Sequence, residues 1–435
     1  MTFSKTHSSA VRHARDMLAF INASPSPWHA VSTMVECLQE DSFTELLETD
    51  TWALQAHARH FVIRGGSLIA FICGGESPAE SGYRIAGAHT DSPGLRLKPL
   101  AAHVSEGMLR LGVEVYGGPI LATFTDRDLG LAGRVQKRSE KGIETQLINI
   151  SRPVVRLPNL AIHMNREVNE QGLKLNRQTE LNVLFSGQDP LSADAFKSFI
   201  ASELNCAPED MLAMDVLVRD TQEGAIWGAR EEYVSSGQLD NLASCHSIIQ
   251  ALLKVDEPRH TVVGAFFDHE EVGSESSVGA SGSFVSDILA RIGEGLFVHG
   301  TDALRARARS TFMSLDMAHA FNPNFPAASE PNHRLRINGG PAIKFNASQR
   351  YATDSESAAR VMRWCEAAEV PFQQYVHRSD LACGSTIGPM VSARLGMPTV
   401  DVGAPMWAMH SLRESAGVLD SWWLTKVLDQ VFEGR

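Results

Sequence analysis

The sequence has few cysteines, and none of them are spaced to bind a metal together. No CxxC pattern occurs in its 435 residues, and the six cysteines are far apart: Cys37, Cys73, Cys206, Cys245, Cys365 and Cys383. A chain of this length with so few isolated cysteines has neither a disulfide framework nor a thiolate zinc site. We therefore expect a cytoplasmic protein in which any bound metal is held by other side chains.

Long apolar runs and excess positive charge are also missing. No uninterrupted apolar run approaches the roughly 20 residues that span a bilayer, so we expect no membrane segment. The N-terminal stretch has charges scattered among its apolar positions and no small-residue cleavage site, which argues against a signal peptide. Lys and Arg number 39 against 51 Asp and Glu, a net charge of −12. Such an acidic surface repels phosphate backbones, so we expect no nucleic-acid partner.

The overall composition is that of an ordinary globular protein. Apolar residues make up 43% of the chain and charged residues 21%, which excludes disordered, collagen-like and coiled-coil classes. The length predicts one large domain or two medium ones.

The pattern of apolar residues predicts an α/β fold with an insertion. Two helices are expected within residues 1–40, a hairpin at 61–73 and a strand at 84–88. After Asp240, apolar strands alternate with helices at 241–254, 283–293, 355–369 and 413–432, which predicts a helix-flanked, mixed but mostly parallel sheet. Between them, short alternating runs at 109–118, 132–136 and 144–150 indicate antiparallel strands, with one helix at 192–204. We predict a catalytic domain of residues 1–94 and 236–435, interrupted by a β-rich dimerisation domain of residues 95–235.

Five segments place His or carboxylate residues directly after apolar strands or before a helix. They are AGAHTDSPG with His89 and Asp91, SGQLDNLAS with Asp240, FFDHEEVGS with Glu270 and Glu271, SLDMAHAFNPNF with Asp316, and APMWAMHSLRE with His410. Each segment alone also fits a solvated loop or a hydrogen-bonded histidine. Together they favour a site, because an open α/β sheet keeps its ligands at the carboxyl ends of its strands. Carboxylates at the edge of a buried sheet are costly unless a cation or partner compensates them.

Two histidines and several carboxylates, without a thiolate, suit Zn²⁺, Mn²⁺ or Co²⁺. Two metals that share one carboxylate, each with one further histidine and one further acid, require two histidines and three acids. One acid is then left for proton transfer. The set therefore fits a dinuclear hydrolytic site.

The segments also resemble a known family. The strings AGAHTDSPGLRLKP, LDNL, DHEEVGS, SxDMAHAxNPN, GPAIKxNxxQRYATD, CGSTIGP and MHSxRE are similar to those of the aspartyl aminopeptidases. These are dinuclear zinc metallopeptidases of the tetrahedral aminopeptidase type, and the chain resembles a bacterial member. The resemblance extends over nearly the whole chain, including residues 157–170 of the insertion.

The resemblance implies a role for each residue of the site. His89 and Asp316 would bind one metal, Glu271 and His410 the other, and Asp240 would bridge both. Asp91 would orient the ring of His89. Glu270 would be the general base, and adjacent glutamates on an extended segment would point to opposite sides.

Three further positions follow from the same resemblance. Lys344 would bind an acidic substrate side chain, and Tyr351 would hydrogen-bond the scissile carbonyl. His163 would reach the active site of a neighbouring subunit, or else be a strand histidine within a dimer interface. The family implies a dodecamer built from dimers. Gln238 departs from the pattern, because a basic residue is expected at that position.

The sequence thus predicts an aminopeptidase with two Zn²⁺ ions per subunit, or Mn²⁺ or Co²⁺, that removes N-terminal Asp or Glu from peptides. A deacylase or carboxypeptidase with the same metal site is the alternative enzyme. Lys344 favours the aminopeptidase for acidic N-terminal residues over these alternatives, because it could bind the carboxylate of Asp or Glu. A metal-stabilised assembly scaffold without turnover is a third reading. A closed structural site has no use for a spare carboxylate such as Glu270, which disfavours the scaffold. The predicted insertion contributes no metal ligand, which favours a role in assembly, and its strand edges would be covered by another subunit.

Overall fold

The computed structural model describes residues 3–140 and 142–433, which form two compact units. The first unit contains the residues up to Asp91, Gly224–Met409 and the residues from Glu414 on. The second contains Ser92–Glu223 and His410–Arg413. The chain re-enters the first unit at Gly224, before the predicted boundary at residue 235, because two short strands after Gly224 pair within that unit. The catalytic and dimerisation roles of the units stay predictions.

The first unit is built on a nine-stranded mixed sheet with the order β1-β2-β3-β13-β4-β14-β18-β16-β17. Its central strands β13, β4, β14 and β18 run parallel to one another, as the alternation of strands and helices predicts. The strands are β1 (Thr44–Glu45), β2 (Arg59–Arg64), β3 (Ser67–Ile72), β4 (Tyr83–His89), β13 (Thr261–Phe267), β14 (Thr311–Leu315), β16 (Ala342–Phe345), β17 (Gln373–Val376) and β18 (Thr399–Gly403).

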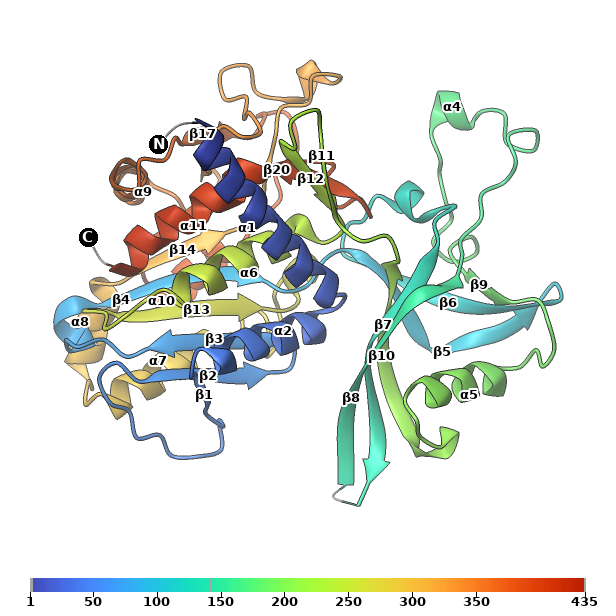
Figure 1. The fold of residues 1–435 in the computed structure, drawn as a ribbon, viewed down its shortest axis with the longest axis horizontal. Coiled ribbons are helices and arrows are strands. Elements are labelled where there is room, and N and C mark those ends of the chain that lie inside the picture. Colours follow the sequence, from blue (N-terminus) through green and yellow to red (C-terminus); the bar gives the residue numbers. More distant parts are fainter. Residues whose placement is uncertain (1–2, 141, 434–435) are drawn as a thin grey trace. The chain divides into compact units, whose positions relative to one another are not determined.

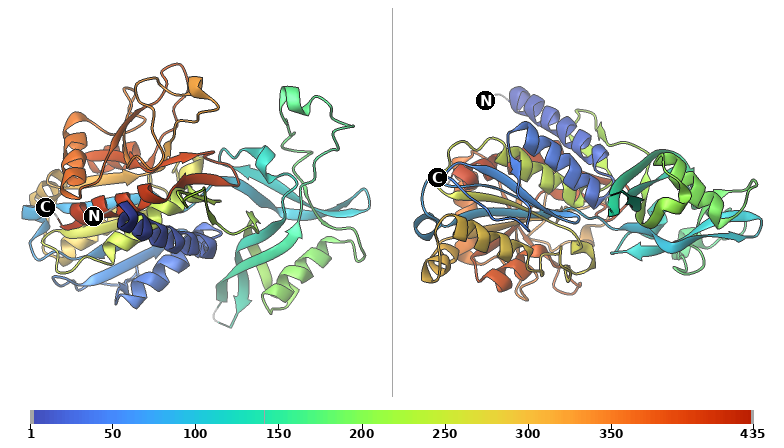
Figure 2. Two further views of the ribbon diagram at one scale, coloured as in Figure 1. Left: turned by 45° about the horizontal axis from the view of Figure 1, so that its top comes forward. Right: turned by 90° about the horizontal axis from the view of Figure 1, so that it is seen from below.

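Helices cover both faces of this sheet, and two apolar cores lie between helices and strands (Figures 1 and 2). One face is packed by α1 (Phe3–Ala23), α2 (Pro27–Glu40), α6 (Leu239–Leu252), α9 (Ser355–Ala367) and α11 (Val418–Glu433). The other is packed by α3 (Pro78–Ser81), α7 (Phe284–Gly295), α8 (Thr301–Ala308) and α10 (Ile387–Leu395). The two helices predicted within residues 1–40 are confirmed, and a Ser-Pro segment separates them: Ser26 caps α2 by accepting the His29 N–H, and Pro27 begins the helix.

A second, five-stranded sheet of the first unit corrects one helix boundary. Its order is β11-β12-β20-β19-β15. The predicted helix at 413–432 begins only at Val418, because the preceding residues form a strand of this sheet. The strands are β11 (Ala225–Trp227), β12 (Tyr233–Ser236), β15 (Ala318–His319), β19 (Pro405–Trp407) and β20 (Glu414–Gly417).

The second unit is β-rich, as predicted, and has an apolar core of its own. Its antiparallel sheet has the order β8-β7-β10-β5-β6-β9. The elements are β5 (Gly94–Ser105), β6 (Met108–Tyr116), β7 (Leu129–Ser139), β8 (Gly142–Val155), β9 (Val183–Ser186), β10 (Met211–Asp220), α4 (Val168–Gln171) and α5 (Ala193–Glu203). Across the described residues, no helix combines the length and apolar character needed to cross a membrane.

Candidate active site

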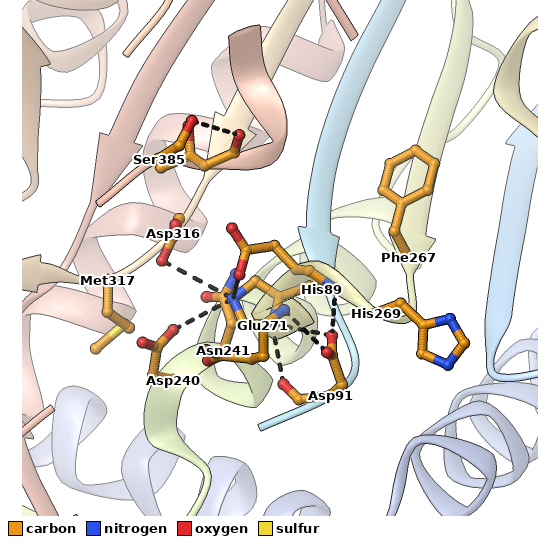
Figure 3. Close-up of polar contacts among 12 residues, drawn as sticks. His89, Asp91, Asp240, Asn241, Phe267, His269, Glu271, Asp316, Met317 and Ser385 are labelled. Carbon is orange, nitrogen blue, oxygen red and sulfur yellow. Dashed lines mark hydrogen bonds and ion pairs between the residues drawn. The ribbon is translucent and has the colours of Figure 1, made fainter. Parts of the chain in front are cut away.

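His89 lies at the centre of a cluster of carboxylates at the carboxyl ends of the parallel strands (Figure 3). It ends β4, while Asp316 follows β14 and Asp240 lies at the start of α6. The His89 Nε2 atom is 3.4 Å from Asp240 Oδ1, 4.0 Å from Asp316 Oδ1 and 4.0 Å from Glu270 Oε2. Neighbouring parallel strands bring their carboxyl ends to one sheet edge, which explains how residues far apart in sequence meet.

The cluster offers ligand atoms in two groups that share His89. In the first, atoms of His89, Asp240 and Asp316 all lie within 4.8 Å of one another. In the second, the same limit holds for His89, Glu270 and Glu271. Imidazole nitrogen and carboxylate oxygen are donors that Zn²⁺ accepts. The residues present therefore fit the metal that the sequence predicts.

Burial and mutual repulsion alter the acidity of the carboxylates. Burial raises the pKa of Glu270 to about 8, and the neighbouring carboxylates add to this rise against the opposing charge of His89. Burial likewise raises the pKa of Glu271 well above its ordinary value and that of Asp316 to about 6. Buried carboxylates that repel one another in this way are what a divalent cation compensates.

Asp91 connects the histidine with the glutamate pair. Its carboxylate accepts the N–H of Glu270 on Oδ1 and the N–H of Glu271 on Oδ2, both at 3.1 Å. The Nδ1 atom of His89 is 2.9 Å from the backbone oxygen of Asp91 and 3.5 Å from its Oδ1. Asp91 thus contacts both sides of the cluster, whereas the sequence suggested a contact with His89 alone.

The glutamate pair is not on an extended segment, so that prediction was wrong. Residues Glu270–Val272 form a short 3₁₀ helix, η3, which begins after His269 in a left-handed conformation with φ of 65°. The two N–H groups at its start find acceptors on Asp91, which favours the turn. Successive side chains of a 3₁₀ helix diverge by about 120°, so Glu270 and Glu271 still point in different directions.

Two residues missed by the sequence analysis hold Asp240 in place. The Nδ2 of Asn241 donates to the backbone oxygen of Leu315 at 2.7 Å, which ties the start of α6 to the end of β14. The buried carboxylate of Glu414 accepts the N–H of Asp240 at 3.1 Å. Asn241 lies within the LDN string and Glu414 within the MHSxRE string, so the strings themselves contained the signal.

Lys344 and Tyr351 lie beside Asp316. Lys344 is only 2% exposed, and its Nζ donates to the backbone oxygens of Asp316 at 2.8 Å and Met317 at 3.1 Å. The same Nζ is 3.8 Å from Asp316 Oδ2 and 5.0 Å from the centre of the Tyr351 ring. Lys344 therefore supports the Asp316 segment as well as facing the cluster. Burial raises the pKa of Tyr351, so its hydroxyl stays protonated.

The remaining two candidates belong to the second unit, and their part in the site stays a prediction. His410 begins the segment His410–Arg413, where its Nδ1 lies 3.1 Å from the oxygen of Gly118 and its own oxygen accepts the Ile120 N–H at 2.9 Å. His163 is exposed in a turn between β8 and α4. It is not on a strand, so the alternative reading of a strand histidine was wrong in that respect.

Comparisons with known proteins agree on one family. The protein-family model described as "Aminopeptidase I zinc metalloprotease (M18)" matches residues 20–432. A "Probable M18 family aminopeptidase 2" of Pseudomonas savastanoi pv. phaseolicola is 43% identical over 423 residues, covering 96% of this chain and 97% of its own. Its counterpart from Azotobacter vinelandii is 43% identical over 417 residues, covering 95% and 96%.

Solved structures also match the chain over most of its length. The structure described as "Cryo-EM structure of the Ape4 and Nbr1 complex" matches with a TM-score of 0.95 and 35% identity, over 100% of this chain and 87% of that one. A second match, "Structure of S. cerevesiae mApe1 dodecamer", has a TM-score of 0.85 and 26% identity, covering 97% and 96%.

Proposed function

This chain belongs to the M18 family of aminopeptidase I zinc metalloproteases, and from that premise we propose that it removes N-terminal Asp or Glu from peptides at a dinuclear zinc site. The observation that carries the proposal is the buried cluster of His89 with carboxylates at the strand ends, beside the cation of Lys344. The family supports the metal and the aminopeptidase activity. Lys344 supports the preference for a substrate with an acidic N-terminal residue, because burying a carboxylate side chain away from water is costly unless a cation pairs with it.

The residues divide into metal ligands and groups that act on the substrate. His89 and Asp316 would hold one zinc, Glu271 and His410 the other, and Asp240 both. Bound zinc polarises a scissile carbonyl and lowers the pKa of water. The Oε atoms of Glu270 would take the proton from the attacking water and deliver it to the leaving amine. The protonated Tyr351 hydroxyl would donate to the carbonyl oxygen as negative charge develops there.

A substrate panel tests this proposal. Chromogenic amides of Asp, Glu, Ala and Leu should be cleaved by the zinc-loaded protein, with the highest kcat/KM for Asp and Glu. N-acetyl-Asp amides should resist cleavage, because an aminopeptidase recognises the free amine. Release of acetate from the acetylated substrates would instead indicate a deacylase. Release of C-terminal residues from peptides would indicate a carboxypeptidase.

Lys344→Met should reduce activity on every substrate and reduce it further on acidic ones. The loss common to all substrates follows from the two backbone oxygens that Lys344 holds beside Asp316. A charge-assisted hydrogen bond contributes about 1.5–3 kcal/mol, so kcat/KM for Asp and Glu amides should fall by roughly 10- to 150-fold more than for Ala and Leu amides. Lys254→Met, which removes an exposed lysine paired with Asp429, is the matched control and should behave as wild type. An equal loss on all four substrates would assign Lys344 to structure alone.

We further propose a homo-oligomer, a dodecamer built from dimers, in which His163 acts on a neighbouring subunit. One structural relative is described as a dodecamer. The turn that contains His163 also exposes the apolar side chains of Leu160, Ile162 and Met164, which another subunit would cover.

Mixed assemblies test the contribution in trans. His163→Phe and Glu270→Gln subunits, each of low activity alone, should recover activity when co-expressed with different tags and purified through both. The recovery arises because some sites then combine wild-type His163 with wild-type Glu270. Doubly tagged assemblies of His163→Phe alone are the control. Full activity of monomers, identified by light scattering during the assay, would contradict the proposal.

A further inference from the structure

A buried carboxylate outside the ligand set touches two segments next to the site. Asp401 is the third residue of β18, and its side chain is 0% exposed. It pairs across the sheet with Ser314 of β14, two residues before Asp316.

Both carboxylate oxygens of Asp401 accept hydrogen bonds from other segments. Oδ2 accepts the backbone N–H of Ala352 at 2.6 Å, and Oδ1 accepts the hydroxyl of Thr386 at 2.5 Å. The N–H of Asp401 in turn donates to Oγ1 of Thr353 at 2.9 Å. Hydrogen bonds therefore run in both directions between β18 and residues 351–353.

The packing around Asp401 leaves room for this carboxylate and little more. A Cβ atom added to Gly388, at the start of α10, would lie 2.4 Å from Asp401 Oδ2 and 2.6 Å from Oδ1. Only glycine lets the helix approach the carboxylate this closely. This accounts for the second glycine of the CGSTIGP string.

The segment held by Asp401 begins with Tyr351. The Tyr351 ring is 4% exposed and lies 5.0 Å from the Nζ of Lys344, which itself donates to the backbone of Asp316. Ser385, beside Thr386, donates to the oxygen of Arg350 at 3.3 Å and ties the two segments together again. A displacement of residues 351–353 would therefore move the Tyr351 ring relative to Lys344.

We infer that Asp401 is a positioning residue, which holds the backbone after Tyr351 and the start of α10 so that the Tyr351 hydroxyl meets the substrate carbonyl. The inference rests on the proposed function in one respect, the role of Tyr351. It assigns Asp401 no contact with substrate or metal. A misplacement of about 1 Å is enough to cost about 10²-fold in rate.

Three variants disturb the carboxylate in different ways. Asp401→Ala removes both acceptors. Asp401→Asn keeps them in part, since its oxygen accepts the Ala352 N–H and its amide can donate to Thr386. Gly388→Ala displaces the carboxylate without removing it. Asp420→Asn is the matched control, because Asp420 is equally buried and accepts the N–H groups of Asn338 and Gly340 at 2.6 and 2.9 Å, away from residues 350–353.

Kinetics of these variants, alone and combined with Tyr351→Phe, measure the coupling. In zinc-replete protein, Asp401→Ala and Gly388→Ala should lower kcat by about 10²-fold with zinc content unchanged, and Asp401→Asn should restore much of the loss. In the Tyr351→Phe background the same changes should cost no more than about twofold, the scatter of additive effects. The loss from Asp420→Asn, whatever its size, should be the same in both backgrounds. Equal losses from Asp401→Ala with and without Tyr351, or none at all, would overturn the inference.

Hydrogen–deuterium exchange keeps the inference testable even if the chain proves to be no peptidase. Exchange in Asp401→Ala should rise at residues 350–353 and 385–388 and stay at the wild-type level elsewhere in the first unit. A rise throughout the unit, or none in these segments, would overturn positioning by Asp401. If exchange in Asp401→Ala rises at these segments as expected but the wild-type protein cleaves no aminoacyl substrate, the proposed function is rejected and the positioning role of Asp401 is kept.

Discussion

Glu270→Gln should lower kcat by about 10²–10⁴-fold while the zinc content of the protein stays that of wild type. Glutamine has the shape of glutamate and still accepts hydrogen bonds, but it cannot take a proton from water. The backbone of residue 270 would remain held, because its N–H donates to Asp91 whatever the side chain. The measurement pairs steady-state kinetics with metal analysis of the same sample.

Glu271→Gln provides the contrast. If Glu271 is a metal ligand, the protein should lose metal when the charge of this side chain is removed, so activity and zinc content should fall together. Added zinc should recover part of the activity in this variant and none in Glu270→Gln. Glu275→Gln, an exposed glutamate of the same loop, is the control and should match wild type. If the two variants exchange these behaviours, base and ligand have been assigned in reverse.

The parts of the fold that the sequence predicts are those encoded by local pattern. Apolar runs such as VVGAFF and TFMSL form the central strands β13 and β14, and the Ser-Pro break separates α1 from α2. The candidate ligands follow from the same logic. His89 ends β4, Asp316 directly follows β14, and the glutamate pair follows β13 after two residues. Parallel strands bring those ends to one edge of the sheet.

The features that the sequence does not predict depend on contacts between distant segments. Asp401 is 49 residues from Ala352, and nothing near Asp401 in the chain indicates that its carboxylate accepts that N–H. The 3₁₀ turn of the glutamate pair likewise depends on Asp91, 179 residues before Glu270. Strand β20 is only four residues long and pairs with β12 and β19, so no periodicity within it distinguishes it from the start of α11.

Removal of zinc should abolish peptidase activity and also lower the thermal stability of the protein. Asp240, Asp316, Glu270 and Glu271 crowd around a single histidine in the first unit, and without a cation their repulsion opposes folding. A ligand that binds only the folded state stabilises it by about 2.7 kcal/mol when its free concentration is 100 times its Kd. Dialysis against a chelator should therefore lower the unfolding temperature as activity is lost, and added Zn²⁺ should restore both. Titration of the stripped protein should reach a plateau at two ions per subunit.

The zinc-saturated chelator is the control for dialysis, because it matches the buffer and cannot remove metal. Asp240→Asn is the control within the chain. As the shared ligand, Asp240 should be needed for both ions, so this variant should bind little zinc, and its unfolding temperature should rise little when zinc is added. Mn²⁺ and Co²⁺ should substitute in part, since the same nitrogen and oxygen ligands accept them. Full activity in a preparation shown by metal analysis to contain no divalent transition metal would contradict the dinuclear site. A plateau at one ion per subunit would be compatible with peptidase activity but would exclude a bridging role for Asp240.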